Sequence, residues 1–155
     1  MTSDEWPKAD VCNCLALRQA ARHVTQFYDQ FLADAGLRTT QFSILAKLRR
    51  MGPLPINALA KELVMDRTTL GRNILPLQRE GLLAVVKGRA DRRSKELQLT
   101  DAGLARLRKA VKGWTDAQAQ FETAFGAERT EELRALLHAV SARDLASADA
   151  PAIDN

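Results

Sequence analysis

A strongly basic segment between Asp66 and Leu99 constrains this chain more than any other feature. It holds eight basic and four acidic side chains, so its net charge equals the +4 of the whole 155-residue chain. The residues outside the segment therefore sum to zero. Positive charge concentrated on a short, folded segment is typical of a surface that meets phosphate groups. The segment predicts a DNA-binding module.

The first half of this segment predicts a helix over about 67–79. Asp66 is placed to cap it by accepting from the N–H groups of Thr68 or Thr69, and Gly81 follows as a stop. A shorter helix is expected just before it, starting near Pro55 and burying apolar residues at 56, 59 and 63. Two short helices separated by a tight turn predict a helix-turn-helix motif.

The second half predicts a β-hairpin. Apolar runs at 82–86 and 97–99 flank a charged tip over 87–96, which is the pattern of two strands joined by a long basic loop, or wing. Thr100 is then placed to cap a long helix that Gly126 ends. The fold class expected is mainly α with a small β-hairpin wing.

Helices are also expected on both sides of this module. Apolar residues recur at helical spacing over 10–35, with Gly36 as the stop, and Thr39 or Thr40 can cap a helix that continues to about residue 50 and buries Phe42. A last helix, about 128–145, is expected to bury four apolar residues: Leu133, Leu136, Leu137 and Val140.

Composition excludes several other classes. The first ten residues are polar and contain no apolar core like that of a signal peptide, and no apolar run reaches the roughly 18 residues of a membrane span, so a cytoplasmic protein is expected. The two cysteines and two distant histidines do not have zinc-ligand spacing. No nucleophile, base and orienting residue form a recognisable set, so neither an enzyme nor a cofactor or metal is expected.

The order of these elements resembles the multiple antibiotic resistance regulator (MarR) family. LAKELVMDRTTLGRNILPLQREGLL, residues 59–83, is similar to the family's turn and recognition helix. DRRSKELQLTDAG, residues 91–103, is similar to its wing signature D-x-R-x-x-x-L-x-L-T-x-x-G. The chain departs from many relatives at Gly71, where they carry Thr or Ser, and at Pro76.

The resemblance implies a homodimer that binds a pseudo-palindromic double-stranded DNA site as a transcription regulator, more often a repressor. A small aromatic or phenolic ligand, or oxidation, is expected to release the DNA. The division expected is a flexible segment at 1–9, dimerisation helices at 10–35 and 101–146, the winged helix-turn-helix at 36–100 and a disordered tail at 147–155. The terminal helices have more apolar surface than one module can cover, which independently favours a two-fold dimer. The residues expected at that interface are Val11, Leu15, Trp114, Phe121, Leu133, Leu136, Leu137 and Val140.

Two groups of residues are candidates for DNA contact. On the recognition helix, arginine can pair with guanine and asparagine with adenine in the major groove, whereas Arg67 at the helix start suits a phosphate. In the wing, Arg93 is expected to enter the minor groove, with Asp91 orienting it and the other cations meeting phosphates. A merely solvated charged surface is the alternative for both groups. The candidates are Arg67, Thr68, Thr69, Arg72, Asn73, Arg89, Asp91, Arg92, Arg93 and Lys95.

Gly71 lies within the expected recognition helix and leaves two interpretations open. Its missing side chain either lets the helix approach a base edge closely or lets it pack against the preceding helix. A mid-helix glycine costs about 1 kcal/mol relative to alanine.

Two further features carry alternatives. Cys12 and Cys14 are candidate redox residues, because some members of the family sense oxidants through an N-terminal thiol; a structural or incidental role is the alternative. Four aromatic residues are candidates for lining a ligand pocket, although aromatics at helical spacing more often form core: Phe27, Tyr28, Phe31 and Phe42. For the protein as a whole, the alternative function is a winged-helix module that binds another protein.

Overall fold

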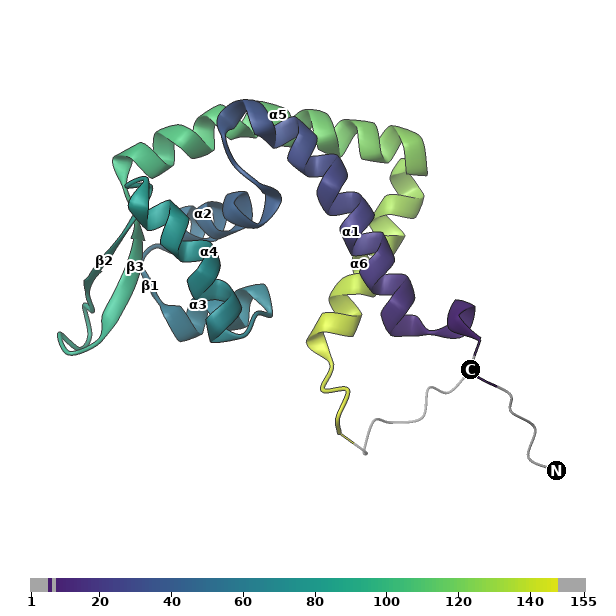
Figure 1. The fold of residues 1–155 in the computed structure, drawn as a ribbon, viewed down its shortest axis with the longest axis horizontal. Coiled ribbons are helices and arrows are strands. Elements are labelled where there is room, and N and C mark those ends of the chain that lie inside the picture. Colours follow the sequence, from purple (N-terminus) through teal and green to yellow (C-terminus); the bar gives the residue numbers. More distant parts are fainter. Residues whose placement is uncertain (1–5, 7, 148–155) are drawn as a thin grey trace. The chain divides into compact units, whose positions relative to one another are not determined.

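The structure is a computed structural model that describes residue 6 and residues 8–147 (Figure 1). It divides into two compact units, Met1–Ala117 and Gln118–Asn155, which are described separately. The fold is mainly helical with a small antiparallel sheet, as the sequence predicts. The expected flexible start falls largely outside the described residues, and so does the expected disordered tail beyond Ser147.

The first unit opens with a long helix and its turn. The 3₁₀ turn η1 (Ala9–Val11) precedes α1 (Asn13–Leu32), and η2 (Ala33–Ala35) follows it. Gly36 ends this region with a positive φ of 69°, the conformation expected of a helix stop.

Helix α2 (Thr39–Met51) begins differently from the prediction. Its N-cap residue is Arg38, whose backbone N–H donates to Gln41 Oε1 at 3.0 Å. Thr39 is already helical, and both its N–H and its hydroxyl donate to Asp29 Oδ1 of α1 at 2.7 Å. The expectation of a Thr39 or Thr40 cap is therefore wrong, because Asp29 of another helix satisfies the Thr39 N–H. Phe42 is half-buried and packs against the core.

The helix-turn-helix consists of α3 (Ile56–Leu63) and α4 (Arg67–Arg79). Asp66 is the N-cap of α4 and accepts from the Thr69 N–H at 2.8 Å, which confirms one of the two predicted donors. The helix continues through Pro76, and Gly81 follows with a φ of 71°.

A three-stranded sheet lies beside these helices (Figure 1). The hairpin strands β2 (Leu83–Lys87) and β3 (Lys95–Leu99) pair in antiparallel register, with Val85 opposite Leu97. A third strand, β1 (Leu54–Pro55), pairs with the other edge of β3 through Leu54 opposite Leu97, giving the order β1-β3-β2. This strand is missing from the sequence prediction, and the hairpin loop is shorter than expected, spanning 88–94 because the strands extend through Lys87 and from Lys95.

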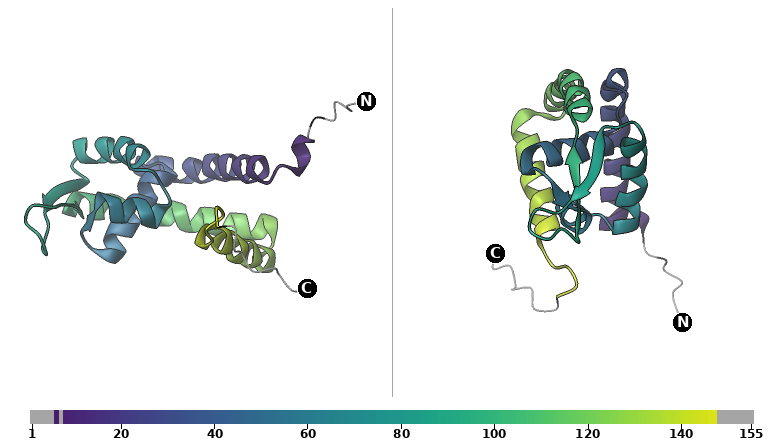
Figure 2. Two further views of the ribbon diagram at one scale, coloured as in Figure 1. Left: turned by 90° about the horizontal axis from the view of Figure 1, so that it is seen from below. Right: turned by 90° about the vertical axis from the view of Figure 1, so that its left-hand side faces the viewer.

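The core of the first unit is aliphatic and links all of these elements. Its least exposed large side chains come from α1, α2, α3, α4 and β2: Leu32, Ile44, Leu45, Leu59, Leu70, Leu77 and Leu83. In the left-hand view of Figure 2 the β2–β3 hairpin extends beyond the helices α2, α3 and α4. The buried leucines therefore fix the recognition helix and the base of the wing in one packed body.

Helix α5 (Asp101–Phe125) starts in the first unit and ends in the second. Thr100 Oγ1 accepts from the Gly103 N–H at 3.0 Å, as predicted for its cap. The same hydroxyl donates to the Gly81 carbonyl at 2.6 Å, which ties the end of the recognition helix to the start of α5.

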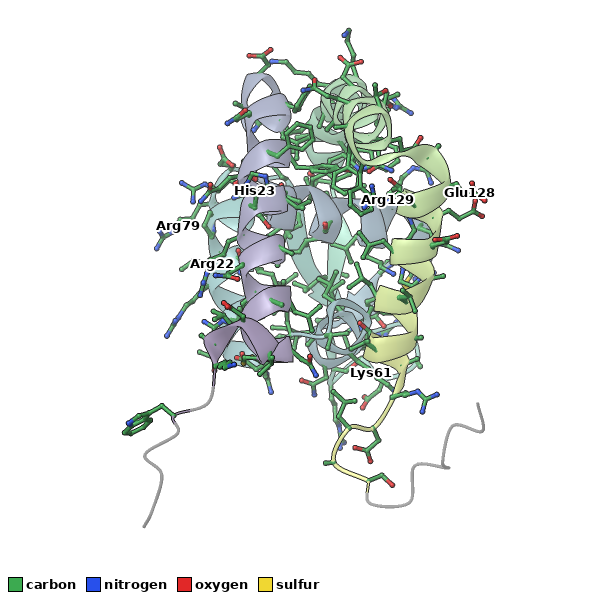
Figure 3. All side chains as sticks on the ribbon, turned by 90° about the vertical axis from the view of Figure 1, so that its right-hand side faces the viewer. Arg22, His23, Lys61, Arg79, Glu128 and Arg129 are labelled. Carbon is green, nitrogen blue, oxygen red and sulfur yellow. The ribbon has the colours of Figure 1, made fainter. Side chains whose placement is uncertain are left out.

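The second unit contains the end of α5, Gly126 with a φ of 100°, and α6 (Ala127–Ala142). The Arg129 guanidinium lies 4.3 Å from the centroid of the Phe125 ring (Figure 3). Helix α6 ends three residues before the predicted end at 145. Its expected buried residues are not buried within this chain, because Leu136 is 66% exposed and Leu137 and Val140 are also exposed.

Candidate nucleic-acid interface

The N-terminus of the recognition helix α4 is held by two hydrogen bonds that Thr69 donates to the Asp66 carboxylate. The Thr69 hydroxyl donates to Asp66 Oδ2 at 2.6 Å, in addition to the backbone hydrogen bond on Oδ1. These two donors, the hydroxyl above all, hold the pKa of the Asp66 carboxyl below its ordinary value. The first turn of α4 is thus fixed, and the Thr69 hydroxyl is engaged within the cap.

One stripe of α4 faces outward, opposite the buried stripe of Leu70, Ile74 and Leu77. Its members recur at i, i+3, i+4, i+7 and i+11, which is one face of a helix. All except half-buried Gly71 are exposed, and they are Thr68, Gly71, Arg72, Leu75 and Arg79. The sequence analysis singled out Thr68 and Arg72 as candidate contacts but missed Leu75 and Arg79, which the same spacing from Thr68 could have found.

Asn73 lies beside this stripe and not on it. Its Nδ2 donates to the Thr69 carbonyl of the preceding turn at 2.9 Å, and its side chain is half-buried. Together with Arg72 it lines a cavity of about 380 Å³ whose other walls include Asp29 and Arg38. The geometry therefore brings Arg72 and Asn73 together, with Arg72 the more accessible of the two.

Gly71 has open space around it. A Cβ atom built on this residue meets no atom within 4 Å outside its own helix and its chain neighbours. The described chain therefore places no neighbouring atom against this position, and close approach of Gly71 to a base edge stays a prediction.

The wing loop is organised by Asp91. Its Oδ1 accepts from the backbone N–H of Arg93 at 2.9 Å, and its carbonyl accepts from the N–H and hydroxyl of Ser94 at 3.1 and 2.7 Å. Gly88 closes the loop by donating its N–H to the Ser94 carbonyl at 2.9 Å. Asp91 thus shapes the backbone that carries Arg92 and Arg93.

The cations of α4 and the wing are not neutralised within the chain. Among the described residues, none of them forms an ion pair, whereas Lys47, Arg106, Lys112 and Arg134 each do. The cations of α4 and the wing are all exposed, and they are Arg67, Arg72, Arg79, Lys87, Arg89, Arg92, Arg93 and Lys95. Figure 3 shows Arg79 at the outer edge of the molecule. Unpaired, exposed cations on two neighbouring elements form a surface suited to phosphates.

The four candidate pocket aromatics separate into two pairs. Tyr28 and Phe42 line a mainly apolar cavity of about 350 Å³ together with Trp114, which stacks on Phe42 at a centroid distance of 6.0 Å. Phe27 packs edge-on against Tyr28 and Phe31, at centroid distances of 5.6 and 5.0 Å. Phe27 and Phe31 do not line this cavity.

The two cysteines lie at the start of α1. Cys12 is its N-cap, and its Sγ accepts from the Leu15 N–H at 3.4 Å, while Cys14 is in the first turn. Both are exposed free thiols.

The candidate dimerisation residues are largely exposed in the single chain. Val11, Trp114, Leu136, Leu137 and Val140 are exposed. Leu15, Phe121 and Leu133 are half-buried.

Other kinds of site receive no support from the described part of the chain. No helix there is both long and apolar enough to cross a bilayer. Nor do any three metal-ligating side chains among residues 6 and 8–147 gather into a group that could hold an ion.

Comparison with known proteins agrees with this interface. Residues 37–95, which contain α2, the helix-turn-helix and most of the wing, match the family model described as the MarR family. The HTH-type transcriptional regulator PecS of Dickeya dadantii is 30% identical over 140 residues, covering 86% of this chain and 84% of PecS.

Solved structures agree as well. The M. tuberculosis transcriptional regulator MosR in complex with DNA is 37% identical with a TM-score of 0.72, covering 84% of this chain and 97% of that one. A probable transcriptional regulator from Pseudomonas aeruginosa is 26% identical with a TM-score of 0.75, covering 86% and 99%. These relatives are transcriptional regulators and not enzymes.

Proposed function

Because the chain belongs to the MarR family of winged helix-turn-helix transcription regulators, we propose that it is a repressor that binds a pseudo-palindromic operator as a homodimer. The observation that carries this proposal is the set of unpaired, exposed cations on α4 and the wing. The similar MosR structure in complex with DNA supports it. Residues 36–100 act as the DNA-binding region, and 10–35 with 101–146 supply the dimer interface.

The residues divide into base-reading and phosphate-binding groups. Arg72 and Thr68, on the outward stripe of α4, read base edges in the major groove. Asn73 supports Arg72 and contacts the groove beside it, while Thr69 acts mainly through the cap and Arg67 meets a phosphate. In the wing, Arg93 enters the minor groove, and Arg89, Arg92 and Lys95 bind phosphates on either side of it.

The dimer forms through the apolar residues of the terminal helices. A row at i, i+3, i+4 and i+7 on α6, from Leu133 to Val140, is solvent-exposed in the single chain for most of its length. A two-fold copy of the same surface covers it. Two copies of α4 then face successive major grooves about 34 Å apart, which explains a palindromic site.

We propose two alternative mechanisms for the release of DNA. A small aromatic ligand fits the cavity of about 350 Å³ between Tyr28, Phe42 and Trp114, because these rings offer it apolar surface. Alternatively, oxidation of the exposed Cys12 or Cys14 alters the start of α1. Both mechanisms act on α1, which α2 contacts through the Asp29–Thr39 hydrogen bonds.

The test is a fluorescence-anisotropy titration against DNA from upstream of the chain's own coding region, at two salt concentrations, with a scrambled duplex as the control. We expect nanomolar binding that prefers the native duplex and weakens steeply with salt, at a slope of about −0.9 per phosphate contacted. Absence of binding to either duplex at low salt would refute the proposal and favour a protein-binding winged helix.

Charge-reversal variants test whether α4 and the wing form the DNA-contact surface. Arg72→Glu and Arg93→Glu are each expected to abolish specific binding, because each replaces a contact by repulsion. Arg108→Glu, at an exposed position of α5 that is not among the proposed DNA-contact residues, makes the same change in net charge and is expected to retain specificity. Equal losses in all three variants would mean that only net charge matters.

A further inference from the structure

Gly71 is the single glycine of this chain without a reason inside the chain to be glycine. The structure describes all eight glycines. Four have a positive φ that favours glycine, and on three others a Cβ would collide with neighbouring atoms. The first group is Gly36, Gly52, Gly81 and Gly126, and the second is Gly88, Gly103 and Gly113. Gly71 has an ordinary helical φ and open space, so alanine would fit it without strain.

A glycine at this position also lowers the stability of α4, because glycine disfavours the interior of a helix. Nothing in the folded chain offsets this, since no atom of the protein fills the space of the missing Cβ. The open space at Gly71 is therefore available to a partner that contacts α4 from outside.

The neighbours of Gly71 on the outward stripe define what that contact is like. Leu75, one turn further along, is 46% exposed, and the Arg72 guanidinium has no ion-pair partner among the described residues. The stripe thus presents a shallow notch with the Gly71 backbone as its floor, an aliphatic side chain on one side and a cation next to it. An apolar group of about the size of a methyl fits such a notch.

We propose that Gly71 and Leu75 form a contact for the 5-methyl group of a thymine, next to a base that Arg72 reads. The thymine methyl is the apolar group that base pairs present in the major groove. Leu75 packs against it, and the absence of a Cβ at Gly71 leaves room for it. This inference rests on the proposed function and adds a specificity-determining position to it.

The experiment adds a methyl group to the protein at Gly71 and, separately, removes the thymine methyl groups from the DNA. Gly71→Ala adds a methyl to the helix, and a duplex prepared with deoxyuridine in place of thymidine lacks every thymine methyl but keeps the same pairing. Anisotropy titrations compare the full-length wild-type and variant proteins on both versions of the native upstream duplex.

For the wild type we expect binding to weaken on the deoxyuridine duplex, by about fourfold for each buried methyl that is lost. For Gly71→Ala we expect about tenfold weaker binding to the thymidine duplex, because the added methyl overpacks the notch. The loss should shrink or vanish on the deoxyuridine duplex. Leu75→Ala is expected to remove the preference for thymidine without this reversal.

Stability is controlled separately. Gly71→Ala should raise the melting temperature by about 2–4 °C. Adding Ala105→Gly, at an exposed position of α5, restores the overall helix propensity, and the double variant is expected to melt near the wild type while keeping the altered DNA preference.

The inference is overturned if Gly71→Ala and wild type show the same ratio of affinities for the two duplexes. In that case specific binding by the wild type would still leave the proposed function intact. Absence of specific binding by the wild type itself would instead refute the proposed function, and the inference with it.

Discussion

Asp91 and Arg93 are connected through the backbone and not through their charges, because the Asp91 carboxylate accepts the Arg93 N–H at 2.9 Å. The aspartate therefore leaves the guanidinium free while fixing the loop that carries it. An acidic residue can therefore occupy a basic loop without neutralising the arginine that we propose meets DNA.

Removing the Asp91 side-chain acceptor should weaken DNA binding. Asp91→Ala loses the hydrogen bond that orders the loop, and we expect about fivefold lower operator affinity with an unchanged melting temperature. Asp91→Asn keeps an oxygen acceptor and is expected to bind nearly as the wild type does. Equal losses in both variants, measured by anisotropy, would show that the charge of Asp91 matters and not its hydrogen bond.

Acidification should release the cap of α4. The pKa of Asp66 is depressed in the folded protein, mainly by the Thr69 hydroxyl, so the stabilisation is fully present above the unfolded value of about 3.9. It is lost as the pH falls through the lower folded pKa. NMR should show the Thr69 amide shift titrating with a midpoint below about 3.9, whereas Asp66→Asn should show no such step. A midpoint at or above that value would contradict the geometry.

Relief of strain in the turn of the helix-turn-helix should stabilise the fold. Val64 ends α3 with a φ of 52° and a ψ of 47°, and its side chain is 75% exposed. A left-handed conformation disfavours a Cβ, so Val64→Gly is expected to raise the free energy of unfolding by about 1 kcal/mol. Val64→Ala keeps the Cβ and should gain much less in chemical denaturation. Similar gains for both substitutions would assign the effect to side-chain exposure.

Charges on the apolar row of α6 should separate the subunits of the proposed dimer. Leu136→Lys and Val140→Lys place ammonium groups where a second copy is expected to pack, so light scattering should report monomers. Ala135→Lys, exposed on the opposite face of the same helix, is expected to remain dimeric. If all three variants remain dimeric, the dimer interface does not include this row of α6.

Local chemistry explains which parts of the fold could be predicted from the sequence. The Asp66 and Thr100 caps and the stop at Gly81 depend on residues within three positions of one another, and all three are confirmed. Strand β1 could not be predicted, since a two-residue strand exists only through its pairing with Leu97. The start of α2 was wrong for the same kind of reason, because the Thr39 N–H bonds to a residue of α1.

In the candidate site, too, features set by local sequence could be predicted, whereas features set by contacts between distant elements could not. The charged tip and the recognition helix follow from the pattern of residues, and the helical period alone would have added Leu75 and Arg79 to the outward stripe. The open space at Gly71 could not be inferred, because it depends on where the neighbouring helices do not reach. The contacts of Asp91 likewise depend on the loop conformation.

The small strand β1 links the wing to the helix-turn-helix. It pairs with β3 of the wing, and its second residue, Pro55, is also the N-cap of α3, so β1 connects the hairpin to the helix that packs against α4. In the proposed dimer we therefore expect a signal to change mainly the separation and tilt of the two helix-turn-helix modules relative to the helical repeat of the operator.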